Sequence, residues 1–202
     1  NLRTSFTENG IHLGPRVFST DADWQLTLAL DSASAATGVT VDGDRIEYRR
    51  ETLLEWYVND ERGLEQGFTV LSPTGVKRDG VVLELAFGGD LLPRLVDAGA
   101  AVEFVAAGEP VLCSSDLRAA DATGRVLPVH FELRDSQKAD ASGSLALVVD
   151  TSDTVYPLTV AHTLTGITFA PDAVWKVESN QEDAQFGTAV AGQRGELEGE
   201  EF

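Results

Sequence analysis

The sequence predicts an all-β fold: an antiparallel β-sandwich, jelly-roll or Ig-like, with about ten strands and little helix. Three observations support this prediction. Apolar residues alternate with polar ones in short runs, turn residues separate these runs, and segments with helical periodicity are scarce. Alternation with a period of two is typical of strands that are buried on one side only.

The clearest strand is "WQLTLAL", residues 24–30, in which Trp24, Leu26, Leu28 and Leu30 share one face. The same alternation predicts strands within residues 43–50, 81–87, 101–106, 126–134, 144–150 and 155–160. Proline cannot donate to a strand ladder. Pro157 therefore indicates an edge strand or a bulge in the last of these segments.

Three segments need separate interpretation. "DATGR", residues 121–125, predicts a turn that joins 116–120 and 125–129 in a hairpin. Residues 47–58 carry glutamates at helical spacing, but their aromatic and β-branched content favours strands. Residues 89–100, "GDLLPRLVDAGA", predict one or two helical turns, with Pro93 in the first turn and Gly99 as the end.

The charge of the chain limits its partners. The 202 residues include 33 acidic and 15 basic side chains, a net charge of −18, so nucleic acid is not an expected partner. No apolar run is long enough for a membrane span, so membrane insertion is not expected.

The start at Asn1 without a methionine favours secretion with a removed leader. Residues 1–170 are expected to form the sandwich, and 171–202 a C-terminal extension with an acidic tail.

No catalytic motif is recognisable, and we expect no enzyme. His12, His130 and His162 stand apart from one another, and Cys113 is interpreted as a small buried apolar residue. A hydrolase on a sandwich scaffold remains an alternative, because a glycosidase needs only two suitably placed acids. Glu84 and Glu103 lie on strands between apolar residues, but alternation places both on the solvent side.

Calcium is the cation that the acidic loops would suit. Asp42 and Asp44 in "VDGDR", and Asp21 and Asp23 in "DADW", have carboxylates at alternate positions, as hard-cation loops do. Neither stretch completes a known calcium loop, and an exposed hairpin turn is the favoured explanation of each.

A calcium-dependent carbohydrate-binding module is a second alternative. It would need exposed aromatic rings, for which Trp24, Trp56, Tyr57 and Trp175 are the candidates. The competing interpretation places Trp24 and Trp56 in the core.

The segment "EWYVNDERGLEQGFTV", residues 55–70, predicts a strand, a turn and a returning strand. Trp56 and Val58 share one face of the first strand. Residues 59–63 form the turn, and Gly67 allows the returning strand a close approach.

Four stretches together resemble a bacterial surface-protein family. They are "EWYVNDERGLEQGFT", "LRAADATGRVLPVHFEL", "YPLTV" and "WKVESNQEDAQFGTAVAG". The first three resemble a β-rich domain found N-terminal to FG-GAP repeats. The fourth resembles the opening of the first such repeat. The aspartate-rich loop of a full repeat does not follow here, so the calcium sites of a propeller do not carry over. The resemblance implies an extracytoplasmic domain and no catalytic residue.

These observations predict a non-enzymatic extracellular structural protein that is self-assembling, as in a filament, sheath or surface layer, or adhesive. Its expected partners are copies of itself, surface polysaccharide or other surface proteins. The terminal segments are the predicted assembly elements, with Asn1 and Phe6 at one end and Phe186 and Phe202 at the other.

Overall fold

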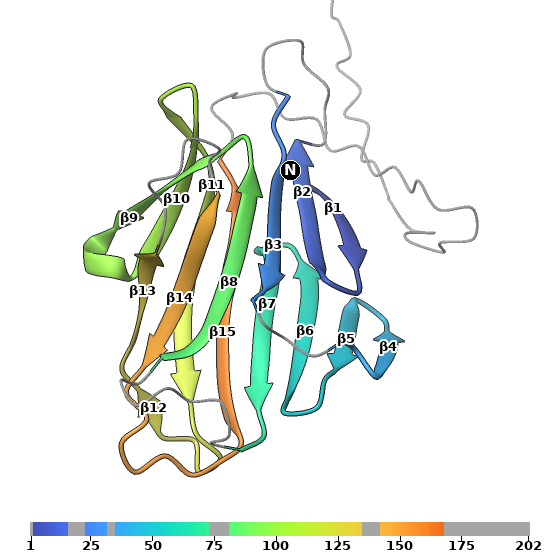
Figure 1. The fold of residues 1–202 in the computed structure, drawn as a ribbon, viewed down its shortest axis with the longest axis vertical. Helices are drawn as coiled ribbons and strands as arrows, with labels where there is room; N and C mark the ends of the chain where they lie inside the picture. The colour runs from blue at the N-terminus through green and yellow to red at the C-terminus, as the bar shows by residue number, and fades with distance from the viewer. Residues whose placement is uncertain (1, 16–22, 32–34, 73–80, 135–141, 168–202) are drawn as a thin grey trace, which may run out of the picture. The chain divides into compact units, whose positions relative to one another are not determined.

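A computed structural model describes residues 2–15, 23–31, 35–72, 81–134 and 142–167, all within the first of two compact units, Asn1–Thr168. Strands dominate this unit, and every strand pair is antiparallel. The strands form two sheets that lie face to face (Figure 1). The predicted all-β antiparallel sandwich is therefore confirmed.

The smaller sheet has six strands in the order β1-β2-β3-β8-β14-β13. Their bounds are β1 Leu2–Thr7, β2 Gly10–Pro15, β3 Leu26–Leu30, β8 Val81–Gly89, β14 Gly143–Val149 and β13 Val129–Arg134. On β3, Leu26 and Leu28 face the core with exposed fractions of 0% and 1%, and Thr27 between them is half-buried.

The larger sheet has nine strands, eight of them in the order β4-β5-β6-β7-β15-β11-β10-β9, and β12 pairs with β11 beside this path. Their bounds are β4 Gly38–Asp42, β5 Arg45–Arg49, β6 Leu53–Asp60, β7 Gly63–Val70, β15 Leu158–Gly166, β11 Glu109–Ala120, β10 Ala101–Ala106, β9 Leu92–Val96 and β12 Val126–Leu127. The strands of residues 47–58 are β5 and β6, so the strand interpretation of that segment is confirmed.

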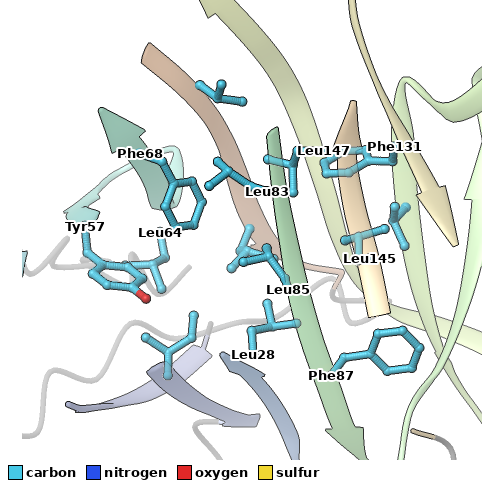
Figure 2. Packing of buried hydrophobic residues seen from close by; sticks show 14 of the residues in the cluster. Leu28, Tyr57, Leu64, Phe68, Leu83, Leu85, Phe87, Phe131, Leu145 and Leu147 are labelled. Atoms are coloured by element: carbon cyan, nitrogen blue, oxygen red, sulfur yellow. The ribbon is translucent and has the colours of Figure 1, made fainter. Parts of the chain in front are cut away.

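The core lies between the two sheets and is continuous across them. Figure 2 shows Leu28, Leu85 and Phe131 of the six-stranded sheet facing Tyr57 and Phe68 of the nine-stranded sheet. Burial of these apolar side chains is the main favourable contribution to folding.

The helix predicted in residues 89–100 is wrong. Leu92–Val96 form the edge strand β9, and the only helical element within residues 89–100 is a three-residue 3-10 turn, Asp97–Gly99. Pairing with β10 outweighs the local helical pattern, and Pro93 is tolerated because an edge strand has one unpaired side. No helix in the described part of the chain is long and apolar enough to cross a membrane.

The interpretation of Pro157 as a sign of an edge strand is also wrong. β15 begins one residue later, at Leu158, and lies between β7 and β11 in the middle of its sheet. A proline just outside a strand removes no ladder hydrogen bond from it, so the constraint does not apply.

The hairpin predicted around residues 121–125 is confirmed in a short form. β11 and β12 pair at two positions, Ala119 with Leu127 and Ala120 with Val126. The Asp121 carboxylate closes the turn by accepting hydrogen bonds from the backbone N–H groups of Thr123 at 2.9 Å and Arg125 at 3.1 Å.

Candidate functional site

A charged cluster is buried on the inner face of the nine-stranded sheet, at the start of β6. Glu55 is 0% exposed and Arg50 is 5% exposed. Arg50 donates to Glu55 Oε2 from Nε at 3.0 Å and from Nη2 at 2.6 Å. A buried ion pair survives desolvation only with close geometry and further hydrogen bonds, so its partners matter.

Tyr57 and Gln66 supply those hydrogen bonds. The Tyr57 hydroxyl donates to Glu55 Oε1 at 2.6 Å, and Gln66 Nε2 donates to the Tyr57 oxygen at 3.0 Å. Burial, and then the neighbouring Glu55 charge, raise the pKa of Tyr57 well above its usual value. Tyr57 therefore stays protonated and remains a donor to Glu55.

The same cluster joins the two sheets. Arg50 Nη2 also donates to the backbone oxygen of Glu8 at 3.0 Å, in the turn between β1 and β2. The ring of Phe6 on β1 meets Tyr57 edge-on at 5.2 Å between centroids. Arg50 and Tyr57 thus hold the N-terminal hairpin against the larger sheet.

A second, neutral polar pair lies on the same inner face. His162 on β15 is 0% exposed, and its Nδ1 lies 2.8 Å from Ser114 Oγ on β11. Burial, with a smaller contribution from the Arg118 charge, lowers the pKa of His162 to about 4. The imidazole is therefore neutral at pH 7, and the Phe131 ring packs edge-on against it at 5.6 Å.

The Ser114–His162 pair lacks the features of a serine hydrolase. Both side chains are 0% exposed, so a substrate cannot reach the hydroxyl. His162 Nε2 is buried without a hydrogen-bond partner, so no carboxylate orients the ring as in a triad. The pair is therefore interpreted as part of the core.

The alternation of inward and outward residues along β6 and β15 indicates that both clusters contain polar side chains on the inner face. Glu55 lies between Leu53 and Tyr57 on the inner face, and His162 lies between Val160 and Leu164. Strict application of the period of two would have placed both polar side chains inside.

Trp56 occupies the opposite face from the one expected. It is 7% exposed but lies outside the core cluster, pairing with Gly67 across β6 and β7. The guanidinium of Arg45 covers its ring, 4.4 Å from the centroid. The close approach predicted at Gly67 is confirmed, because a Cβ there would lie 2.1 Å from Trp56 Cζ2.

The other aromatic candidates do not form an exposed platform in the described residues. Trp24 is 5% exposed within the core cluster, as the competing interpretation predicted, and Tyr57 is 1% exposed. Trp175 lies outside the described residues. The carbohydrate-binding alternative therefore has no support from Trp24, Trp56 or Tyr57.

The calcium candidates do not converge in the described part of the chain, where no group of three or more His, Cys, Asp or Glu is placed to hold a metal ion. Asp42 ends β4, and Asp44 lies in the adjacent turn, where its backbone oxygen accepts from Asn59 N at 3.2 Å. Asp23 is exposed, and Asp21 lies outside the described residues.

The acids considered for hydrolysis are engaged in cross-strand ion pairs. Glu84 Oε1 accepts from Arg134 at 2.5 Å, and Glu103 Oε2 accepts from Arg94 at 2.6 Å. His12 and His130 are exposed on β2 and β13. Cys113 is half-buried, and burial raises the pKa of its thiol.

One edge of the nine-stranded sheet is formed by β4. All five of its residues are exposed, with fractions of 52% for Val39 and 65% for Val41. Val39 pairs with Tyr48 and Val41 pairs with Ile46 across β4 and β5. Both valine side chains therefore lie on the inner face of the sheet, as those of Tyr48 and Ile46 do. The six-stranded sheet leaves this face uncovered, and Figure 1 shows the β4–β5 hairpin at the margin of the fold.

Of the predicted assembly residues, Phe6 packs against the core through Tyr57. Asn1, Phe186 and Phe202 lie outside the described residues. No protein-family model, no curated protein and no solved structure matches the chain. The resemblance to the domain that precedes FG-GAP repeats therefore stays a prediction.

Proposed function

We propose that this chain is a non-enzymatic structural domain of an extracellular assembly, and that it associates with copies of itself. The extracellular placement rests on the acidic composition and on the resemblance to bacterial surface proteins. An adhesive role toward other surface components fits the same placement.

The open edge of the nine-stranded sheet is the observation that carries the proposal. An edge strand with exposed β-branched side chains is a template for pairing with another chain, and soluble monomers usually protect such edges. β4 is exposed along its whole length. By contrast, the polar clusters of the interior are buried and cross-linked by hydrogen bonds, which suits a rigid building block better than a reaction site.

The test is the molar mass of the full chain in solution, measured by light scattering across a wide range of protein concentration. We expect the mass to rise above that of one chain as concentration increases. A mass that stays at one chain up to the highest concentration would contradict self-association.

The melting temperature, measured with calcium and with a chelator, tests whether Asp42 and Asp44 bind the ion. Calcium binding to the folded state would raise the melting temperature.

A further inference from the structure

The four sheet edges of the described sandwich differ in how they are protected. β9 carries Pro93 and Arg94, and β13 presents His130, Glu132 and Arg134. Proline and charge both hinder pairing with another strand. β1 includes Arg3 at its second position, whereas β4, "GVTVD", has no charge or proline before its last residue. β4 is therefore the least protected edge.

The sequence of β4 is complementary to itself in an antiparallel arrangement. If Thr40 of two copies meets on a two-fold axis, Val39 of each copy lies opposite Val41 of the other. Cross-strand pairs of β-branched residues stabilise a sheet. The inner apolar row then continues from Tyr48 and Ile46 through the valines into the second copy. An interface of this kind closes on itself and yields a dimer.

Charges at the two ends of the hairpin match in the same register. Arg49 lies opposite Gly38 on β5, and both residues are on the outer face. Two-fold pairing brings Asp42 of the second copy to the other side of Gly38. The backbones of Arg49 and of this Asp42 are then two strand spacings apart, about 10 Å. The missing side chain at Gly38 leaves room for the long arginine to reach the carboxylate.

Both charges are available for such a contact. Arg49 and Asp42 are exposed, and within the described residues neither side chain forms an ion pair. Arg45, the residue in register with Asp42, donates instead to Glu47 at 3.2 Å and covers Trp56. The two-fold arrangement would create the Arg49–Asp42 contact twice.

We infer that β4 pairs antiparallel with β4 of a second copy, centred on Thr40, and joins the two nine-stranded sheets edge to edge. This inference rests on the proposed self-association and specifies its surface. A longer filament or sheath would need a further interface, because the two-fold contact uses both β4 edges.

Cross-linking tests the register. In the full chain with Cys113→Ala, Thr40→Cys should form a disulfide-linked dimer on mild oxidation, because the two thiols meet at the axis. Ser5→Cys, an exposed position on the β1 edge, is the matched control and should stay unlinked. Equal cross-linking at both positions, or at Ser5 alone, would overturn the inference.

Charge reversal tests the contact between Arg49 and Asp42. Arg49→Asp and Asp42→Arg should each weaken self-association by about tenfold or more, because each homodimer then contains two like-charge contacts. An equimolar mixture of the two variants should recover the wild-type affinity within about threefold, since both contacts are opposite in charge in the mixed dimer. The melting temperature of each variant confirms that it is folded.

The outcomes separate the inference from the proposed function. A wild-type chain that is monomeric at all concentrations contradicts both. A wild-type chain that associates, but without Thr40 cross-links and without recovery in the mixed variants, overturns the β4 interface and leaves self-association through another surface.

Discussion

Two buried polar clusters, Arg50–Glu55 and Ser114–His162, lie on the inner face of the nine-stranded sheet. Both are almost fully excluded from solvent, yet Glu55 pairs with the positive charge of Arg50, whereas His162 pairs with the neutral hydroxyl of Ser114. In the first cluster, an opposite charge and hydrogen bonds compensate for burial. In the second, burial lowers the pKa of His162 to about 4 and the charge is lost. The two clusters should therefore respond differently to mutation and to pH.

The largest effect is expected from Glu55→Ala. This change leaves the Arg50 charge buried without its carboxylate, which costs about 3–5 kcal/mol in the free energy of unfolding. Denaturant titration at pH 7 measures it. Glu103→Ala is the control, because its ion pair with Arg94 is more exposed and should contribute less than about 1 kcal/mol.

A double variant sharpens this prediction. Arg50→Met with Glu55→Leu removes both charges at once, and should destabilise the protein less than Glu55→Ala alone. If the double variant proved the less stable of the two, the hydrogen bond from Arg50 to Glu8 would matter more than the charge that the loss of the Glu55 carboxylate leaves buried.

The second prediction concerns pH. The pKa of His162 is lowered to about 4 in the folded state from an ordinary value of 6.5. Between these values the unfolded chain binds a proton that the folded chain does not, so stability falls as pH decreases. Its contribution is fully present above pH 6.5, and we expect a loss of about 2 kcal/mol from pH 7 to pH 5.

His162→Gln tests this assignment because glutamine does not titrate. The difference in unfolding free energy between pH 7 and pH 5 should shrink in this variant, whatever its absolute stability. A pH dependence as steep as that of the wild type would assign the effect to another group.

The smallest effect is expected from Ser114→Ala. The variant removes the 2.8 Å hydrogen bond and leaves His162 Nδ1 buried without this partner, at a cost of about 1–2 kcal/mol. Ser5→Ala, at an exposed position, should change the unfolding free energy by less than about 0.5 kcal/mol. The pH dependence from His162 should persist in Ser114→Ala, because desolvation rather than this hydrogen bond is its main cause.

Sequence patterns predicted the interior better than the edges. Alternation located the strands that contain Leu28, Leu85 and Phe131, because burial on one side imposes a period of two. It did not distinguish β9 from a helical turn, since a short edge strand with Pro93 has little periodicity. Asp42 and Asp44 stay a prediction as calcium ligands, whereas the burial of Glu55 and the exposure of β4 depend on how far the two sheets cover each other.

The fold class, the apolar faces and the turn closed by Asp121 follow from the amino-acid sequence, because they depend on neighbours a few residues apart. Three features become visible only in the folded chain: Arg50 reaches the turn containing Glu8, His162 meets Ser114, and the valines of β4 lie uncovered. Such features depend on which strands lie beside or opposite one another in the two sheets. That arrangement is set by the packing of the whole core and not by any local pattern.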